Sequence, residues 1–294
     1  MSHHNHNIKN IGLTIFLNTV ITIAQIIGGI ISGSMALLSD AMHNFSDVLS
    51  LIISYVARKL YKKDSNIIHT FGYKRAEILA AFINSSTLIV IAGILIFKSI
   101  ERLIEPQEIQ GNIVIYLATL SILLNGLSVL LIKKDAKDSM NIRSAYLHLF
   151  GDMITSIAVL VGGLIIKVFS WNWIDGIFSL GIAIYLIYSS WKIFTESLKI
   201  IMEFTPEDID IKKIVSEIIK IEGVKNIHHI HVWKLDEHQI NFEAHIDVND
   251  DIYISDFEKI LFLVNKILKN SGIHHSNIQP EYNSDDSKDL INNI

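Results

Sequence analysis

The chain has 294 residues, a formal net charge of −5 and no cysteine, so any bound metal must be held by nitrogen and oxygen. It has no basic block of the kind that binds nucleic acid, and we expect no nucleic-acid partner. Half of the residues are hydrophobic and only 19% are charged, whereas a soluble domain carries about 25% charge, so the composition points to a lipid environment.

Apolar segments long enough to cross a membrane recur along the first two thirds of the chain. A helix needs roughly 20 mostly apolar residues to span the hydrocarbon. Such segments lie at residues 11–31, 35–57, 76–97, 113–132, 146–169 and 173–194. Short, charged connections separate them, which favours a six-helix transmembrane bundle at 11–203 over helices buried in a large soluble core. The first segment is too long for a usual signal peptide, and we interpret it as uncleaved.

The basic residues predict how the bundle is oriented. Connections rich in lysine and arginine face the cytoplasm, and here they follow the second and fourth segments. An even number of spans then places both termini in the cytoplasm of a multi-pass plasma-membrane protein, which we expect to be bacterial. Residues 1–10 form a cytoplasmic N-terminus, and whether its His3, His4 and His6 bind metal stays open.

Two of the apolar segments contain ionisable residues, which are costly in lipid and by default mark a pathway or a site. Both segments read S-x-x-x-H-x-F-x-D when they are aligned on their histidines. His43 and Asp47 are four positions apart, as are His148 and Asp152, so each pair projects from one helical face. Two imidazoles and two carboxylates suit a tetrahedral, zinc-like ion.

The His–Asp pairs have an alternative interpretation, and a further acidic residue lies near the first pair. Each His–Asp pair could instead be a structural hydrogen bond between helices, although two matching pairs make that less satisfactory. Asp40 lies one turn before His43, and we interpret it as a residue of the outer mouth rather than as a fifth ligand.

These features resemble the cation diffusion facilitator (CDF) family. The resemblance covers nearly the whole chain and includes the sequences FGYKRAE (71–77) and HVWKL (231–235). Family members with His and Asp on both helices resemble zinc transporters that often accept cadmium or cobalt. The resemblance therefore implies a homodimeric efflux transporter for Zn²⁺, and not an enzyme. Some relatives hold a further metal near His69, but Asn66 and Tyr73 stand where ligands would be expected, so we predict a weak or absent loop site.

The last third of the chain has the pattern of a small soluble domain. Residues 210–222 and 256–270 have helical periodicity, whereas 228–235, 240–248 and 275–281 read as strands. The α-β-β-α-β order predicts an α+β sandwich, the arrangement of the family's metallochaperone-like cytoplasmic domain. We assign 204–282 to this dimerisation and regulatory domain and expect the polar tail, 283–294, to be disordered.

The soluble domain carries the residues of a possible cytoplasmic metal site. By the same resemblance, His228, His245, His274 and Glu281 stand where related domains bind zinc, and His275 could replace His274. The alternative is that they are ordinary surface histidines on strands and turns.

The expected mechanism is exchange of metal for protons with alternating access. Metal needs deprotonated ligands, and a histidine with a pKa near its ordinary value of about 6.5 can exchange a proton for metal at physiological pH. The first alternative is a membrane-embedded zinc metalloenzyme, which lacks an evident nucleophile or general base beyond the four ligands. The second is a membrane-anchored metal sensor, which would not need ionisable pairs inside two helices.

Overall fold

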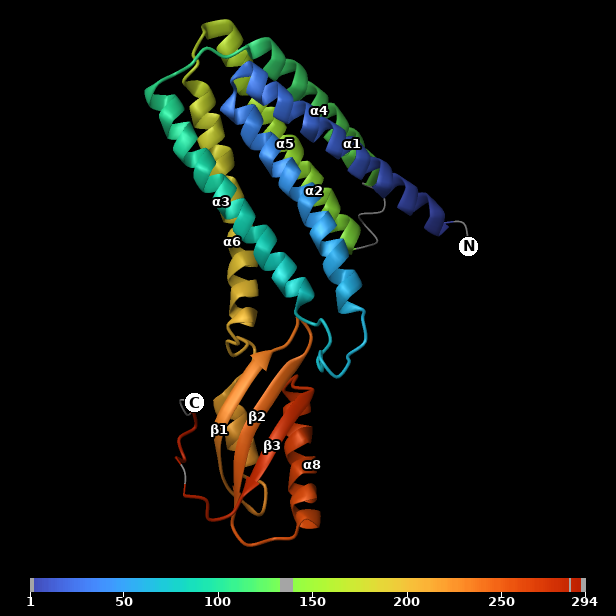
Figure 1. The fold of residues 1–294 in the computed structure, drawn as a ribbon, viewed down its shortest axis with the longest axis vertical. Coiled ribbons are helices and arrows are strands. Elements are labelled where there is room, and N and C mark those ends of the chain that lie inside the picture. Colours follow the sequence, from blue (N-terminus) through green and yellow to red (C-terminus); the bar gives the residue numbers. More distant parts are fainter. Residues whose placement is uncertain (1–2, 133–139, 286, 292–294) are drawn as a thin grey trace. The chain divides into compact units, whose positions relative to one another are not determined.

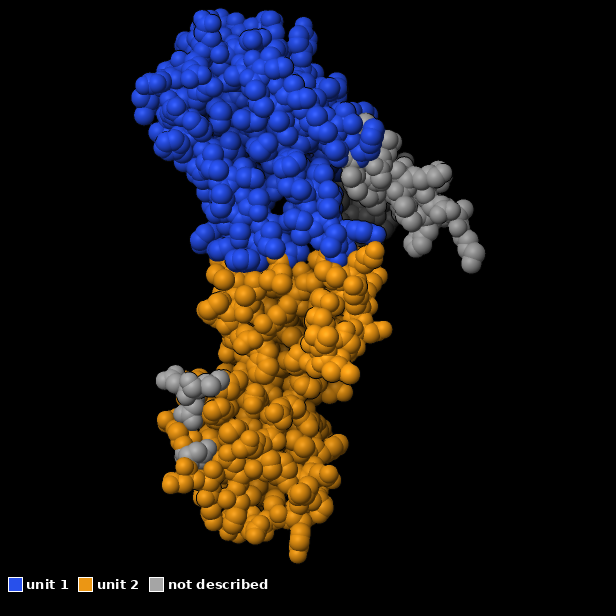
Figure 2. Space-filling model, viewed as in Figure 1, with its two compact units in different colours: residues 1–56, 80–194 blue, residues 57–79, 195–294 orange. Residues whose placement is uncertain are grey.

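The protein folds as two compact units (Figure 1, Figure 2). The computed structural model describes the backbone of residues 3–132, 140–285 and 287–291 and, within these ranges, all side chains except those of residues 3–15, 17, 128, 131, 132 and 140–148. One unit comprises Met1–Val56 and Ala80–Phe194, and the other comprises Ala57–Leu79 and Thr195–Ile294.

Six long helices precede the sheet in the chain, which confirms the predicted helical bundle (Figure 1). They are α1 (His3–Ser32), α2 (Met35–Tyr61), α3 (Ala76–Ile104), α4 (Gly111–Ile132), α5 (Met140–Phe169) and α6 (Ile174–Ile201). Each helix extends beyond its predicted apolar span, and α2 continues through Arg58 and Lys59. Hydropathy marks only the part of a helix that suits hydrocarbon, whereas backbone hydrogen bonds continue into the polar boundary.

The helices differ in how readily each would cross a membrane by itself. Among the described residues, three stretches are long and apolar enough: Ala76–Ile104, Leu149–Phe169 and Ile174–Ile201. Shorter apolar stretches of α1 and α4 are Asn18–Ser32 and Gly111–Leu127. Ionisable side chains such as His43 and Asp47 interrupt the apolar character of α2. The helix least suited to lipid is therefore the one that carries the first His–Asp pair.

The interior of the bundle consists largely of small and medium apolar side chains from α2 to α6. The buried cluster comprises Ala36, Leu37, Ala92, Leu95, Val114, Ala118, Val159, Ile182, Ala183 and Leu186. Large side chains such as Phe97, Tyr116 and Tyr188 are instead exposed. A soluble protein would bury most of these, whereas a lipid-facing surface accommodates them.

A carboxylate of α6 caps the first turn of α2. Asp175 accepts hydrogen bonds from the Ser34 hydroxyl (2.6 Å) and from the backbone N–H groups of Met35 (2.7 Å) and Ala36 (3.2 Å). These amides have no partner within their own helix, and the positive end of the helix dipole favours a carboxylate there. Gly33, at φ +73°, permits the sharp turn that leads into α2. The start of α2 is thereby fixed to the start of α6.

The second unit contains a three-stranded sheet with two helices packed against its core, which confirms the predicted α-β-β-α-β order (Figure 1). Its elements are α7 (Ile211–Ile218), β1 (Val224–Lys234), β2 (Ile240–Val248), α8 (Ile254–Asn270) and β3 (His275–Glu281). The strand order is β1-β2-β3, with β1 antiparallel and β3 parallel to β2. Alternate residues of β2, from Ile240 to Val248, are buried in the core as the sequence pattern predicts.

Part of the C-terminal tail lies on the sheet. The backbone N–H groups of His229 and Ile230 donate to the carbonyls of Asp289 (3.3 Å) and Leu290 (2.9 Å), and Leu290 packs against the core. The prediction of a disordered tail was therefore wrong for these residues. Composition does not reveal that the free edge of β1 offers donors for pairing.

Candidate metal centres

Three of the four predicted membrane residues come together between α2 and α5. His43 Nε2 lies 3.1 Å from Asp152 Oδ1 and 3.7 Å from Asp47 Oδ2. One ligand atom from each of the three residues lies within 4.8 Å of the other two. The side chain of His148 lies outside the described residues. The assignment of all four as a metal site stays a prediction.

The spacing of these ligand atoms suits a small divalent ion. A tetrahedral ion with bonds of about 2.0–2.1 Å separates its ligand atoms by roughly 3.3 Å. The two measured separations from His43 Nε2, 3.1 and 3.7 Å, bracket that value. His43 and Asp152 are buried, where two neighbouring carboxylates are costly unless a cation or protons neutralise them. The cluster can therefore hold a dication or exchange it for protons.

A third carboxylate lies beside this cluster, and sequence reasoning placed it wrongly. Asp40 is fully buried and is not at an exposed mouth. It accepts hydrogen bonds from the Gln25 amide (2.7 Å), the Thr155 hydroxyl (2.8 Å) and the Ser156 hydroxyl (3.0 Å). Donors from α1 and α5 thus surround this carboxyl group one turn from His43. Thr155 and Ser156 fall in the turn after Asp152, which is the sequence signal that could have indicated this.

The second predicted set assembles in part on the sheet. His228 and His245 are paired across β1 and β2, and Glu281 ends β3 beside them. Glu281 Oε2 lies 3.3 Å from His228 Nε2, and Glu281 Oε1 lies 2.8 Å from His245 Nδ1. His228 is fully buried and Glu281 is 9% exposed. These three residues can bring two nitrogens and a carboxylate to one ion.

His274 is not brought to this cluster. It precedes β3, seven residues before Glu281, and an extended strand of that length spans roughly 23 Å at about 3.3 Å per residue. His274 and His275 are exposed and line a different cavity with Tyr61 and Lys74.

Asp247 is a further carboxylate beside this cluster, on the other ring nitrogen of His228, that sequence reasoning missed. Its Oδ2 lies 3.5 Å from His228 Nδ1, and it is the register partner of Glu281 in the parallel pair of β2 and β3. Asp247 is two residues after His245, and alternate residues of a strand share a face, so the sequence contained this signal. The cluster therefore has the same two kinds of donor as the membrane set.

A bulge in β1 shapes this cluster. The pairing register shifts between His228 and His231, and His229 adopts φ +53°, a conformation that few residues other than glycine take. The His229 ring stacks on His245 with 4.6 Å between centroids. Bulges of this kind redirect side chains beside functional sites.

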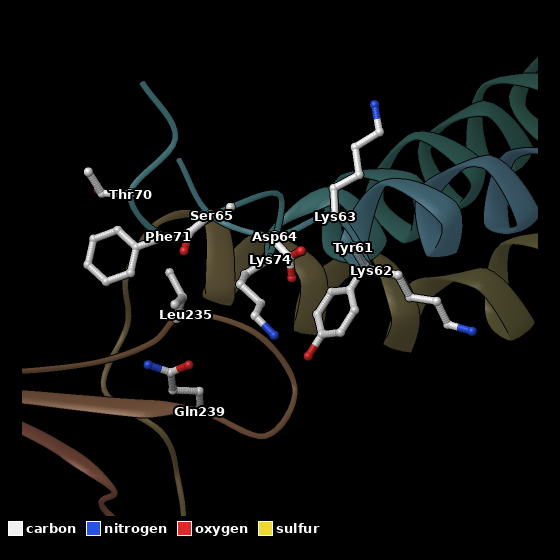
Figure 3. A pocket seen from close by; sticks show the side chains of 11 residues that line it. Tyr61, Lys62, Lys63, Asp64, Ser65, Thr70, Phe71, Lys74, Leu235 and Gln239 are labelled. Carbon is white, nitrogen blue, oxygen red and sulfur yellow. The ribbon is translucent and has the colours of Figure 1, made fainter. Parts of the chain in front are cut away.

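The connection between α2 and α3 borders an open cavity of about 490 Å³ in the second unit (Figure 3). The residues named in the loop prediction make local contacts there. Asn66 Oδ1 accepts the backbone N–H groups of Ile68 and His69 (both 2.9 Å), and the His69 ring stacks on Tyr73 with 4.7 Å between centroids. Asn66 and Tyr73 thus hold the turn, and a weak or absent loop metal site stays a prediction.

The end of α2 also contacts the turn between β1 and β2. The Tyr61 hydroxyl donates to Asp236 Oδ2 (2.9 Å), and Lys74 Nζ lies 4.1 Å from the centroid of the Tyr61 ring. Burial alone would raise the pKa of Asp236, but the backbone N–H groups of His238 and Gln239, with Tyr61 and Lys74, hold it below its ordinary value. An ionised Asp236 therefore fixes the β1–β2 turn to Tyr61.

Comparison with known proteins covers both parts of the chain. The family profile described as the cation efflux transmembrane domain matches residues 11–202, and the one described as the cation efflux protein, cytoplasmic domain, matches residues 206–283. A cadmium, cobalt and zinc/H(+)-K(+) antiporter of Bacillus subtilis (strain 168) is 36% identical over 284 residues, which cover 95% of this chain and 91% of that protein.

Two further relatives have similar coverage. The zinc transporter ZitB of Pectobacterium atrosepticum is 31% identical over 288 residues, which cover 95% of this chain and 89% of that protein. The metal cation efflux system protein CzcD of Cupriavidus metallidurans is 29% identical over 279 residues, which cover 95% and 88%.

Proposed function

The chain belongs to the cation diffusion facilitator family of cation efflux proteins, and from this premise we propose that it exports Zn²⁺ from the cytoplasm in exchange for protons. Family membership makes it a multi-pass membrane transporter, which sets aside the metalloenzyme and the membrane-anchored sensor. Cd²⁺ and Co²⁺ are the further substrates we propose, since a relative at 36% identity is named for transport of all three metals. We place the protein in a bacterial plasma membrane as a homodimer.

The cluster of His43, Asp47 and Asp152, in which His43 and Asp152 are buried, is the observation that carries this proposal. Nitrogen and oxygen donors at these separations favour zinc over manganese, which prefers oxygen alone. With His148 as the fourth ligand, α2 and α5 would each supply one imidazole and one carboxylate. A cation held between two helices can be released when the helices move.

Proton exchange follows from the chemistry of the same ligands. An imidazole binds metal only when it is neutral, so a proton and the ion compete for His43. Asp47 and Asp152 can stabilise either the bound ion or a protonated imidazole beside them, because both carry positive charge. Asp40 lies one turn before His43 and accepts hydrogen bonds from Thr155 and Ser156 beside these ligands. Protons entering from the outer side would then expel the ion.

The cytoplasmic cluster serves regulation in this proposal. His228, His245 and Glu281, with Asp247 beside them, would bind an ion from the cytoplasm and stabilise one transporter state. These residues belong to the other compact unit, and we propose that the ion they bind is distinct from the transported ion. His274 remains part of the family-based prediction, although the single chain keeps it away from the cluster.

Zinc flux into sealed proteoliposomes tests the proposed function. We expect an acidic lumen to accelerate Zn²⁺ uptake by the purified full-length protein, and a protonophore to remove the acceleration. The His43→Ala variant should abolish uptake, whereas His69→Ala, a matched histidine substitution in the loop, should retain it. Uptake that ignores the pH gradient would contradict proton exchange, and folded protein without zinc uptake would contradict zinc export.

A further inference from the structure

The cytoplasmic cluster already has a cation of the protein's own beside it. Lys288 Nζ, from the C-terminal tail, lies 2.9 Å from Asp247 Oδ1 and 3.1 Å from Glu281 Oε2. The same Glu281 Oε2 lies 3.3 Å from His228 Nε2. The Lys288 ammonium therefore shares its two carboxylates with the histidines that are positioned to bind metal.

The ion pairs of Lys288 matter because the two carboxylates that it contacts are largely buried. The side chains of Asp247 and Glu281 are 9% and 7% exposed, whereas that of Lys288 is 36% exposed. Two carboxylates taken out of water are costly without a positive charge, and the ammonium supplies one. Because Lys288 reaches them from the solvent side, its ammonium can return to water once another cation neutralises the two carboxylates.

Contacts at the edge of β1 attach the described part of the tail. Two backbone hydrogen bonds, from His229 and Ile230 to Asp289 and Leu290, hold it to the edge of β1. Consecutive amides of a regular strand point to opposite sides, and the bulge at His229 lets both face the tail. Leu290 adds one partly buried apolar contact. Neighbouring residues 287–289 are exposed.

A metal ion and the ammonium would compete for this position. An ion bound by His228, His245 and Glu281 would take lone pairs of the carboxylate that Lys288 now contacts. It would also place two further positive charges within a few ångströms of the ammonium, a strong repulsion at partly buried sites. The two cations therefore cannot both be held well by Glu281 and Asp247.

We propose that Lys288 is a tethered competitor for the cytoplasmic metal site, which occupies Asp247 and Glu281 until Zn²⁺ displaces it together with the 287–290 segment. This inference rests on the proposed function, in which the cluster binds a regulatory ion. An intramolecular competitor has an effective concentration set by its tether and not by the amount of protein. The tail would thus set the zinc level at which the regulatory site fills.

Zinc binding to full-length protein in detergent tests the competition. We expect Lys288→Gln to tighten Zn²⁺ binding at the cytoplasmic site by about tenfold, the change to which 1.4 kcal/mol corresponds. Lys288→Arg keeps the positive charge and should bind zinc as the wild type does. The site is identified as the zinc equivalent lost in His245→Ala, and in the double variant His245→Ala/Lys288→Gln the effect should vanish. A chain that ends at Asp285 should resemble Lys288→Gln.

Hydrogen exchange provides a second readout that does not depend on transport. Zinc should accelerate amide exchange in peptides covering residues 224–234, because His229 and Ile230 lose their tail acceptors, and it should not do so in His245→Ala. Unchanged zinc affinity in Lys288→Gln, or exchange that zinc slows, would overturn the competition. If no zinc equivalent disappears in His245→Ala while transport persists, the regulatory site itself fails and the transport proposal stands.

Discussion

The membrane cluster and the cytoplasmic cluster use the same donors but are built on different backbones. His43, Asp47 and Asp152 project from two helices, and the i, i+4 spacing alone brings the first two together. His228, His245 and Glu281 meet only because three strands are aligned in one register. Helices that slide or tilt can open a site without losing internal hydrogen bonds, whereas a sheet cannot. The helical cluster therefore suits the passage of an ion, and the sheet cluster suits its retention.

The two clusters also differ in the residue that lies beside each of them. Asp40 sits deep beside the membrane cluster, held by Gln25, Thr155 and Ser156. Lys288 sits at the surface of the cytoplasmic cluster, on the tail that pairs with the edge of β1. One cluster has a buried carboxyl group held by several donors beside it, and the other has an ammonium that competes with a metal ion for its carboxylates.

The largest expected effect comes from removing a membrane ligand. Asp152→Asn removes a charge and a metal donor while keeping the shape of the side chain. We expect zinc flux in proteoliposomes to fall by more than the 10–100-fold typical of losing a residue that only supports a metal ligand. Thermal unfolding in detergent should show intact protein. Flux within twofold of wild type would remove Asp152 from the transport site.

A smaller loss is expected when the neighbouring carboxyl group is replaced. Asp40→Asn keeps a similar side chain but replaces one acceptor oxygen of this network with an amide donor, so flux at low zinc should fall by roughly 10–100-fold. Raising the zinc concentration should restore part of it, because the metal ligands themselves remain. Thr155→Val serves as the matched control, since it removes one donor and leaves the carboxylate. Equal defects in both variants would indicate a structural role for the network.

A still smaller effect on transport is expected at the cytoplasmic cluster, where His245 and His274 should differ in their effect on zinc binding. His245→Ala should remove one bound zinc and change the zinc concentration at which transport begins, while flux at saturating zinc persists. His274→Ala, at the far end of β3, should retain that zinc equivalent. Equilibrium dialysis of both variants compares them directly. Loss of the ion in His274→Ala would mean that a contact beyond the single chain completes the site.

The smallest effect concerns the link between Tyr61 and Asp236. Because the pKa of Asp236 is lowered on folding, its contribution is fully present above the ordinary value of 3.8 and is lost as pH falls through the lowered value. Asp236→Asn should therefore be less stable than wild type at pH 7, by about 1 kcal/mol. The two proteins should converge in strong acid. Thermal unfolding at both pH values checks this, and a constant difference would reject the assignment.

The features that could be predicted from the sequence are those set within a single helix or strand. Apolar length and helical spacing act within one segment, so the spans and the pairing of His43 with Asp47 could be found. Strand alternation likewise identified β2. Lys288 could not be found, because its position depends on a tail pairing with β1. Asp40 was misplaced, since its burial depends on donors from α1 and α5 that are distant in sequence.

The cap that Asp175 places on α2 has a consequence for how the transporter can move. Its three bonds join the first turns of α2 and α6, so we expect these ends to move together during the transport cycle. Any displacement of α2 relative to α5 then swings α6 with it, and the hinge lies elsewhere. Spin labels placed on the first turns of α2 and α6 should keep a constant separation, while labels on α2 and α5 should not.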